Sequence, residues 1–337
     1  MRIETRGTAD SERAQDPLQN GAILVDRSAR LRMLFSGDKA AESLTGLLTN
    51  DVNALTPGLG QYAAALTPKG KVLADVRLFA RHDGLLVDTT AAAAPGFASM
   101  IRKFVNPRLA KYQDVTALTC DIGVFGGTAL EVVRAAFPNA DVTAGLAPYS
   151  HVDTPLDGEP LMIASVPDFG VAGFDIIGPR SAIDELNARL ARAGATQGSA
   201  DALQFSRIEA GRPEFGVDMD DTMLAQEVDM DRLEAISYTK GCYTGQETVA
   251  RVHHRGHVNR LLRGLRFADA VLPPVGAQLA DASGKDVGTV RSAAVSPRGG
   301  AIALAIVRRE IEPGANLHAR WSEQSADARV ESLPFRD

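Results

Sequence analysis

A short segment around residue 242 combines a cysteine, a lysine and two glycines in an order that favours thiol chemistry. This signature segment reads Lys240-Gly241-Cys242-Tyr243-Thr244-Gly245-Gln246-Glu247. A neighbouring ammonium group stabilises a thiolate, and glycines beside a cysteine let another molecule approach the sulfur. The segment therefore predicts Cys242 as a functional thiol and Lys240 as the cation that activates it.

A helix is expected to start within the signature segment. Thr244 and Glu247 have the spacing of a capping box, residues 248–252 continue the helix, and Gly256 can end it. The unpaired amides of a helix N-terminus also favour a thiolate at Cys242. The alternative is a tight loop around an inert, buried cysteine, which is the usual state of a free cysteine. The three activating features together favour the functional interpretation.

Two stretches of opposite charge lie on either side of the start of this segment. Residues 214–234 contain eight acidic residues and only Arg232 as a base, a net charge of −7. Residues 240–266 contain six basic residues and only Glu247 as an acid, a net charge of +5, together with three of the six histidines. The positive stretch should attract anions to the neighbourhood of Cys242. The alternative is that both stretches are solvated faces that neutralise each other, and it is favoured for the acidic stretch.

The composition is that of a soluble globular protein with room for two or three domains. The 337 residues are 45% hydrophobic and 23% charged, with a net charge of −6. Aromatic residues make up only 5% of the chain, which argues against a stacking platform for single-stranded nucleic acid. Direct binding of RNA by the basic stretch is disfavoured for this reason and because the chain is acidic overall.

A cytoplasmic protein without a membrane partner is expected. The two cysteines, Cys120 and Cys242, are far apart and form no disulfide framework, which fits a reducing compartment. No stretch approaches the roughly 20 apolar residues of a membrane span. Residues 1–20 mix acidic and basic residues without an apolar core, so a loose leader without a targeting signal is predicted there.

Alternating hydrophobicity predicts strands and helices in the first part of the chain. Strands are expected within 21–36 and at 62–66, 72–80 and 85–89, and helices from Gly37 to about Asn50 and at 95–105. A further strand is expected at 115–124, with one face formed by Leu118, Cys120, Ile122 and Val124. Cys120 is therefore predicted to be a core residue.

Three glycines, Gly123, Gly126 and Gly127, precede a helix that is expected at 128–137 with Thr128 and Glu131 as its cap. A glycine loop before a helix can bind phosphate. This spacing matches neither the dinucleotide fingerprint nor the P-loop, so a packing role is favoured.

The remaining patterns predict the fold class. A strand at 173–177 leads into another helix, and such units mixed with hairpins indicate an α+β fold. From about Val258 onward, short strands that include 287–290 and 301–307 predict a small all-β domain.

The signature segment, followed by Arg251 and Gly256, resembles that of the YgfZ-type folate-binding proteins, which are relatives of the glycine-cleavage T-protein, an aminomethyltransferase. Other segments resemble the same family, at residues 47–52, 207–211, 215–216, 287–290 and 333–335. The resemblance implies a three-domain ring with two ferredoxin-like α+β units and a C-terminal small β-barrel. After the leader predicted at 1–20, it implies a folate-binding region at 21–257 with one unit inserted near 52–125, and the barrel at 258–337.

The resemblance also implies tetrahydrofolate, or a one-carbon derivative, near the centre of the ring. It places four residues at the folate: Glu209, Arg207, Asp75 and Asn50. A carboxylate such as Glu209 can accept two parallel hydrogen bonds from the pterin amino group and ring N–H. The basic stretch then suits the anionic glutamate tail. The alternatives are that Glu209 is a surface or salt-bridge residue, and that Arg251 and Arg255 are ordinary surface charges on a helix.

One position departs from the T-protein pattern. The T-protein carries two adjacent aspartates where this chain has Ala74-Asp75. If the missing carboxylate handles the proton during transfer, the chain binds folate without transferring an aminomethyl group. We therefore expect a binding and assembly protein rather than an enzyme. The alternative is a folate-dependent one-carbon transferase or demethylase.

The YgfZ-type resemblance implies that the chain supports assembly or repair of iron–sulfur clusters, including those of radical enzymes that modify tRNA. Its partners would be iron–sulfur assembly proteins and client cluster enzymes. A stable cluster needs about four thiolate ligands, so no firm metal site is predicted. Cys242 remains a ligand of a transient shared cluster, a disulfide partner of another chain, or an exchanging thiol. His253, His254 and His257 could add ligands, although such histidines more often end a helix.

Overall fold

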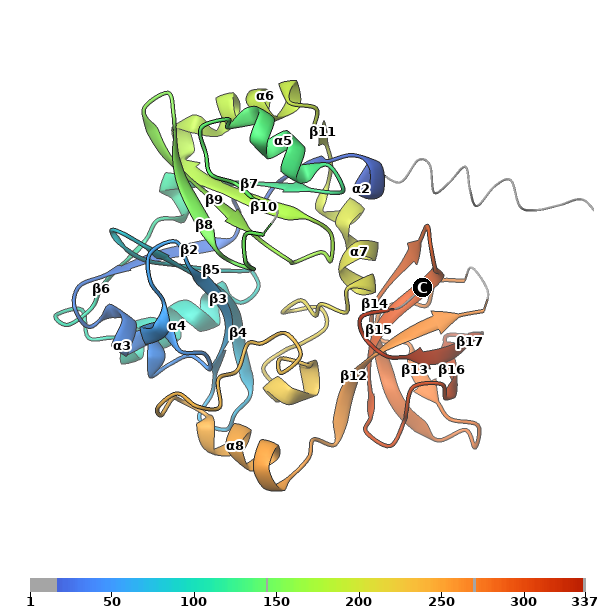
Figure 1. Ribbon diagram of the computed structural model, residues 1–337. Coiled ribbons are helices and arrows are strands. Elements are labelled where there is room, and N and C mark those ends of the chain that lie inside the picture. Colours follow the sequence, from blue (N-terminus) through green and yellow to red (C-terminus); the bar gives the residue numbers. More distant parts are fainter. Residues whose placement is uncertain (1–16, 144, 269–270, 336–337) are drawn as a thin grey trace, which may run out of the picture.

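The computed structural model describes residues 17–143, 145–268 and 271–335. It has the expected α+β fold, in which two sheet units and a barrel surround a segment of little regular structure (Figure 1). Residues 1–16 of the leader predicted at 1–20 lie outside the described residues. Its last four residues form α2 (Pro17–Asn20), in which Leu18 is buried, so the prediction of a loose leader is wrong there.

Five antiparallel strands form the first sheet, in the order β3-β4-β5-β2-β6. Their bounds are β2 (Leu31–Ser36), β3 (Gly60–Leu66), β4 (Val72–Arg81), β5 (Gly84–Thr89) and β6 (Lys111–Asp114). Apolar residues of α3 (Ala40–Thr45) and α4 (Ala94–Phe104) share a core with the sheet. A short 3₁₀ helix, η1 (Val52–Ala54), follows α3. The predictions for β3, β4, β5 and α4 are confirmed. Helix α3 is shorter than expected, because Leu48 forms a β-bridge with Ala65 instead of extending the helix.

The second sheet has six strands in the order β11-β1-β7-β10-β9-β8. Their bounds are β1 (Ile23–Asp26), β7 (Thr119–Phe125), β8 (His151–Leu156), β9 (Glu159–Ser165), β10 (Gly173–Pro179) and β11 (Thr196–Gln197). Helices α5 (Ala129–Ala136) and α6 (Ile183–Arg192) share its core, and η3 (Arg180–Ala182) precedes α6. Because β1 pairs with β7, the whole five-stranded sheet is inserted in sequence between two neighbouring strands of the six-stranded sheet.

The structure tests the predictions for the strand that contains Cys120, for the glycine loop after it and for the cap of the next helix. Cys120 is buried in the core as predicted, but Leu118 belongs to the 3₁₀ helix η2 (Thr116–Leu118) and is 58% exposed. A β-carbon on Gly127 would lie 1.9 Å from the carbonyl oxygen of Gln19. The glycine loop therefore packs closely against backbone, in agreement with the packing role that was favoured over phosphate binding. Thr128 is the N-cap of α5 but makes no side-chain capping bond, so the cap prediction is wrong.

The C-terminal unit is a closed antiparallel barrel in the order β12-β15-β14-β13-β16-β17, which confirms the predicted all-β domain. Its strands are β12 (Arg260–Phe267), β13 (Gln278–Ala280), β14 (Asp286–Ser296), β15 (Gly300–Arg308), β16 (Asn316–Trp321) and β17 (Gln324–Glu331). Small and branched residues of these strands fill the barrel interior.

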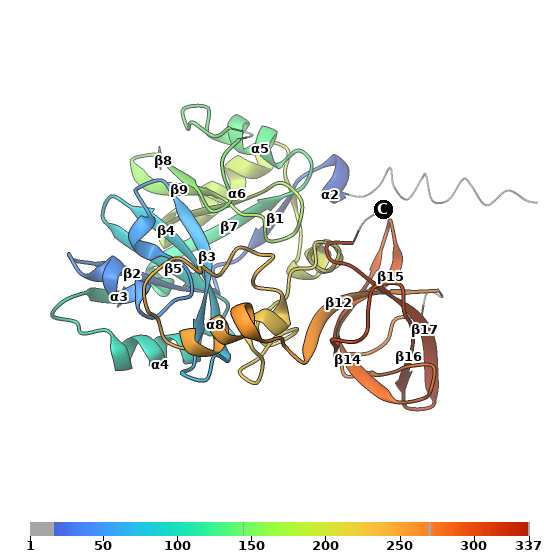
Figure 2. The ribbon, with the colours of Figure 1, turned by 60° about the horizontal axis from the view of Figure 1, so that its bottom comes forward.

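The segment between the sheets and the barrel contains only short helices. These are η4 (Ala200–Leu203), α7 (Gln204–Glu209), η5 (Ala225–Val228) and α8 (Gln246–Arg255). Buried methionines at 219, 223 and 230 belong to the largest apolar core, which also contains residues of both sheets and of the barrel. Helix α8 lies between the five-stranded sheet and the barrel (Figure 2).

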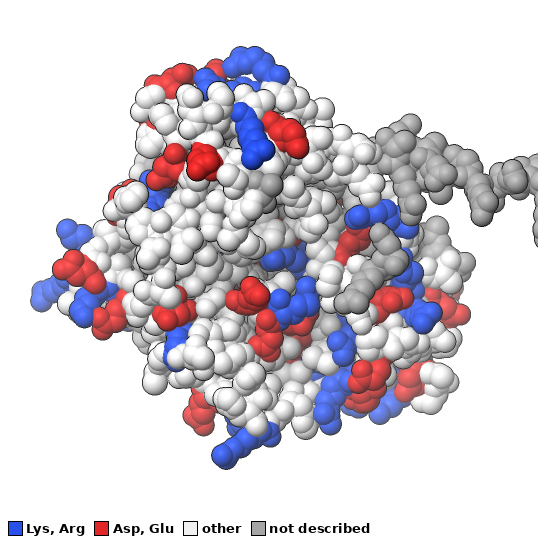
Figure 3. Space-filling view, viewed as in Figure 1, with Lys and Arg blue, Asp and Glu red and all other residues white. Residues whose placement is uncertain are grey.

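The acidic stretch is only in part the solvated face that was expected: Asp221, Asp231 and Glu234 are exposed, whereas other acidic residues of the stretch are buried or paired. Asp218 is fully buried and accepts hydrogen bonds from Arg207 and from the hydroxyl of Ser292. Asp220 and Glu227 form ion pairs with Arg291 and Arg260 of the barrel. Charges of both signs accordingly alternate over the barrel side of the molecule (Figure 3). The acidic stretch therefore attaches the barrel to the rest of the chain.

Candidate functional site

Two adjacent cavities lie where the sheets, α7 and the barrel meet. The inter-sheet cavity, of about 320 Å³, is lined by residues of β1, β3 and β4 and of the segment after α7. The barrel cavity, of about 410 Å³, is lined by residues of α7, β12 and β15 and of the turn between β14 and β15. Phe169 and Arg212 line both cavities, so the two are neighbours.

Asp75 of β4 is a buried carboxylate that faces the inter-sheet cavity. It is 8% exposed, and burial raises its pKa. The hydroxyl of Tyr62 donates to its Oδ2 over 2.9 Å. Its buried Oδ1 has no hydrogen-bond partner among the described residues. An unpaired buried acceptor is costly, so this oxygen is poised to accept a hydrogen bond from a ligand.

A buried cluster of ion pairs holds the wall next to Asp75. The guanidinium of Arg77 contacts Asp88, Asp168 and Asp175 at 2.7, 2.9 and 2.6 Å. Asp121 lies farther away, 3.7 Å from Arg77, and burial raises its pKa to about 7. Because Asp168 and Asp175 come from the six-stranded sheet unit and Arg77 from the five-stranded sheet, the cluster fixes one sheet against the other.

The ring of Tyr62 lines another side of the inter-sheet cavity and is supported by Tyr149, which itself lines neither cavity. The rings of Tyr62 and Tyr149 are stacked, with centroids 5.9 Å apart and planes inclined by 13°. The guanidinium of Arg212 lies 6.0 Å from the centre of the Tyr62 ring and donates to the Tyr149 hydroxyl over 3.1 Å. Flat rings beside a planar cation suit the binding of a planar ligand.

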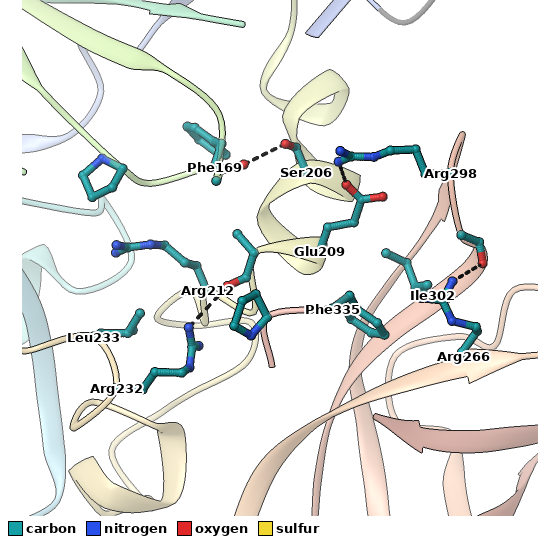
Figure 4. A pocket seen from close by; sticks show the side chains of 15 residues that line it. Phe169, Ser206, Glu209, Arg212, Arg232, Leu233, Arg266, Arg298, Ile302 and Phe335 are labelled. Atoms are coloured by element: carbon teal, nitrogen blue, oxygen red, sulfur yellow. Dashed lines mark hydrogen bonds and ion pairs between the residues drawn. The ribbon is translucent and has the colours of Figure 1, made fainter. Parts of the chain in front are cut away.

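Glu209, the predicted pterin anchor, faces the barrel cavity (Figure 4). The hydroxyl of Ser296 donates to one of its carboxylate oxygens and the guanidinium of Arg298 to the other. Arg266 lines the same cavity and donates to the Gly299 carbonyl over 2.9 Å. Arg232, a fourth side chain of this group, donates to the Gly211 carbonyl. Arg212, Arg232, Arg266 and Arg298 line this cavity together with the single carboxylate of Glu209, which is paired with Arg298, so the lining is cationic.

The other two residues that were predicted to lie at the folate are used for internal support. Arg207 donates to Gln204, to the Arg212 carbonyl and to the buried Asp218. The amide of Asn50 donates to the carbonyls of Tyr62 and Glu234, at 3.0 and 2.9 Å. Arg207 lines the inter-sheet cavity, whereas Asn50 lines neither cavity.

Lys240 attaches the signature segment to α3. Its ammonium donates to the carbonyls of Thr45 and Leu48, at and just beyond the C-terminal end of that helix. It also lies 4.5 Å from the centre of the Tyr243 ring, and burial lowers its pKa to about 8. A cation at a helix C-terminus satisfies carbonyls that have no helical partner. Lys240 therefore positions the segment that carries Cys242.

The start of α8 corrects the predicted capping box. The N-cap is Gly245, with φ of +86° and no side-chain capping bond, and the helix ends at Gly256 as expected. The Thr244 amide donates instead to the Gly46 carbonyl. A β-carbon at Gly245 would lie 2.7 Å from the Thr67 carbonyl oxygen, so only glycine fits between α8 and the β3–β4 hairpin.

Replacing Gly245 by alanine should therefore destabilise the protein by about 1–3 kcal/mol, because the side chain would meet backbone in a left-handed conformation. The free energy of unfolding in urea measures this loss. Gly241→Ala is the matched control, since a β-carbon there would have no described atom within 4 Å and the φ of Gly241 is not positive. Equal stability of the two variants would contradict the tight fit at Gly245.

Cys242 is exposed, whereas Cys120 is buried. The burial that the alternative interpretation expected for Cys242 is thus wrong. Cys242 lines neither of the two cavities, and it precedes the N-cap of α8 by three residues. Its thiol is accessible to another protein.

The histidines of α8 form aromatic contacts. The ring of His253 stacks on Tyr238 at 3.7 Å, and His254 meets His253 edge-on at 4.8 Å. Within the described ranges, no group of three or more His, Cys, Asp or Glu side chains could hold a metal ion. Arg251 of the same helix is exposed.

Several residues of the site were not predicted from the sequence. Tyr62, Arg77 and Arg212 line the inter-sheet cavity, and Arg298 binds Glu209. One signal was present: Asp75 and Arg77 are charged residues at alternate positions in the interior of β4, whose other residues before Arg81 are apolar. Such an alternation places both on one face of β4, away from the apolar core.

In the part of the chain that the structure describes, no helix is long and apolar enough to cross a membrane.

Known protein families match both the sheet-containing part of the chain and the C-terminal barrel. The GCVT N-terminal domain family matches residues 8–237, and the glycine cleavage T-protein C-terminal barrel domain family matches residues 260–337. The chain is 28% identical to an aminomethyltransferase of Rubrobacter xylanophilus, over 95% of this chain and 84% of that protein. It is 27% identical to the tRNA-modifying protein YgfZ of Yersinia enterocolitica, over 89% of this chain and 88% of that protein.

The fold has a close counterpart among solved structures. Aminomethyltransferase T of the glycine cleavage system from Bartonella henselae superposes with a TM-score of 0.84, at 20% identity, over 97% of this chain and 89% of that one. The likeness confirms the expected arrangement of two α+β units and a C-terminal barrel.

Proposed function

The chain belongs to the glycine cleavage T-protein family, and we propose that it is a tetrahydrofolate-binding accessory protein for iron–sulfur enzymes, with Cys242 as its functional thiol. Clients would include enzymes that modify tRNA, as the name of its YgfZ relatives suggests. The single observation that carries the folate part is the unpaired, buried Oδ1 of Asp75 in the inter-sheet cavity, which has no partner among the described residues.

The inter-sheet cavity fits a pterin. The pterin ring is planar and presents an amino group and a ring N–H side by side, which a carboxylate can accept. Asp75 offers its unpaired Oδ1 and the second lone pair of Oδ2, which accepts one bond from the Tyr62 hydroxyl, and the Tyr62 ring lines the same cavity. We therefore assign Asp75 as the pterin acceptor in this proposal.

The barrel cavity fits the anionic tail of the same molecule. It shares Phe169 and Arg212 with the inter-sheet cavity, so a long ligand can extend from one to the other. Guanidinium groups bind carboxylates in a forked geometry, and Arg232, Arg266 and Arg298 line this cavity. In this assignment Glu209 holds Arg298 in position instead of binding the pterin, because both of its oxygens are already paired.

In this proposal, the thiol of Cys242 serves the iron–sulfur clusters. It is exposed, lies on a loop fixed by Lys240, and lines neither cavity. A single thiol cannot hold a cluster alone, so a client or assembly protein would supply the other ligands or a second thiol. The proposed folate site and the proposed thiol therefore act on different molecules.

A folate-dependent one-carbon transferase is the second candidate, and one observation favours it. Ala74 is fully buried among the residues that α3 and α4 cover, whereas Asp75 faces the cavity. The departure from the T-protein pattern at position 74 therefore removes no carboxylate from the site. A buried aspartate with a raised pKa is also suited to proton transfer.

An assay of one-carbon transfer distinguishes the two candidates. The purified chain is incubated with tetrahydrofolate and an aminomethyl donor, with the aminomethyltransferase of Rubrobacter xylanophilus as the positive control. We expect no transfer above the rate without protein. Transfer at a rate comparable to the control would establish the enzyme and overturn the accessory role.

A further inference from the structure

A basic and apolar surface lies at the C-terminal end of α4, outside both cavities. This α4 patch consists of exposed residues from the last turn of α4 to the start of β6: Arg102, Lys103, Phe104, Arg108, Leu109 and Lys111. Phe104 and Leu109 are 51% and 56% exposed and lie five positions apart, so two large apolar side chains are exposed within one cationic segment. In Figure 2, α4 lies at the outer margin of the molecule, away from the barrel.

Among the described residues, the cations of the patch lack acidic partners. None of the four forms an ion pair within the described parts of the chain, and no acidic residue occurs between positions 102 and 111. Elsewhere, arginines such as Arg81 and Arg192 pair with a nearby carboxylate. The patch thus carries a net charge of +4 on a chain whose net charge is −6.

The backbone holds the apolar side chains outward. Val105 and Ala110 are buried in the core of the five-stranded sheet unit, on either side of the loop. The amides of Leu109 and Ala110 both donate to the Asn106 carbonyl, at 2.9 and 3.0 Å. Leu109 is therefore exposed on a fixed turn, and Phe104 is exposed at the last position of α4. The ammonium of Lys103 lies 5.1 Å from the centre of the Phe104 ring, which places charge beside the apolar centre.

We propose that the α4 patch is the docking surface for a partner protein that presents acidic side chains around an apolar centre. Protein interfaces combine an apolar core with a polar rim, and complementary charge steers the partner to the surface. An aliphatic side chain such as Leu109 contributes nothing to stacking on bases, so a protein fits better than RNA.

The patch belongs to the same structural unit as the anchor of the signature segment. Helices α3 and α4 share one core, and Lys240 binds the end of α3. A partner bound at the patch is thereby held by the unit to which the Cys242 loop is attached. The docking surface itself does not depend on the thiol role proposed for Cys242.

A fluorescent peptide of alternating glutamate and leucine serves as the probe, and its anisotropy is titrated with the full chain. We expect binding that Arg102→Glu with Arg108→Glu weakens at least about tenfold, or roughly 1.4 kcal/mol. Phe104→Ser with Leu109→Ser should weaken it as well. The matched control is Lys285→Glu with Arg309→Glu, which reverses two exposed charges on the barrel and should leave binding unchanged. Melting temperatures verify that the variants fold.

Equal peptide binding by the parent chain and the Arg102/Arg108 variant would overturn the proposal. Tighter, patch-dependent binding of poly-uridine RNA or of phosphatidylserine vesicles would also overturn it, in favour of a nucleic-acid or membrane surface. Because Cys242→Ala should leave peptide binding intact, failure of the docking surface is distinguishable from failure of the thiol role.

Discussion

Cells that carry Cys242→Ala in place of the parent chain should lose cluster-dependent tRNA-modifying activity to the level of cells that lack the chain. The expected loss is large because no other thiol is available: Cys120, the second cysteine, is buried in the core. The measurement is the fraction of tRNA that carries the modification, at matched protein levels. Serine at position 242 should fail equally, since a hydroxyl neither binds iron as a thiolate does nor exchanges with disulfides.

The Cys242 variant isolates chemistry from folding. Replacing an exposed residue usually changes stability by only about 0.5 kcal/mol or less, so the variant should be as stable as the parent. Lys285→Ala alters an exposed residue of the barrel unit that lines neither cavity and lies outside the signature segment, so it should keep full activity. Normal tRNA modification in the Cys242→Ala cells would contradict the thiol role.

Replacing Asp75 by asparagine should weaken tetrahydrofolate binding by about 10- to 100-fold, or roughly 1.4–3 kcal/mol. Asparagine keeps the size of the side chain and an acceptor for the Tyr62 hydroxyl. It replaces the free carboxylate oxygen by an amide, which presents donors to the donors of the pterin. Titration calorimetry on the two proteins measures the difference in affinity.

Glu209→Gln is the comparison that locates the pterin. If Glu209 only positions Arg298, the variant should lose less affinity than Asp75→Asn, and the loss should concern the glutamate tail. Pteroate, which lacks that tail, should then bind the Glu209 variant as well as it binds the parent. A greater loss for Glu209→Gln, with pteroate as with folate, would place the pterin in the barrel cavity instead.

Local patterns predicted the elements better than the site. The strands and hairpins of the five-stranded sheet follow alternating hydrophobicity, and Asp75 and Arg77 interrupt it on one face of β4. Residues that meet across the fold leave no such pattern. Glu209 and Arg298 are 89 positions apart, and Lys240 and Thr45 are 195 positions apart. Their pairing depends on how the three units assemble.

Capping was predicted incorrectly for a physical reason. Thr244 has the residue type and spacing of an N-cap, yet its amide is bonded to Gly46 and the helix begins after Gly245. The close approach of the β3–β4 hairpin, which a propensity argument does not include, selects glycine at the cap. The charge pattern misled in part, because Asp220 and Glu227 of the acidic stretch pair with Arg291 and Arg260 of the barrel instead of facing solvent.

The central claim is that one chain binds reduced folate in its inter-sheet cavity and carries its functional thiol outside it. Anaerobic titration calorimetry of the parent chain and Cys242→Ala with tetrahydrofolate tests both parts at once. We predict one folate per chain and the same affinity for the two proteins, because Cys242 lines neither cavity. No binding by the parent chain, or loss of binding in Cys242→Ala, would contradict the account.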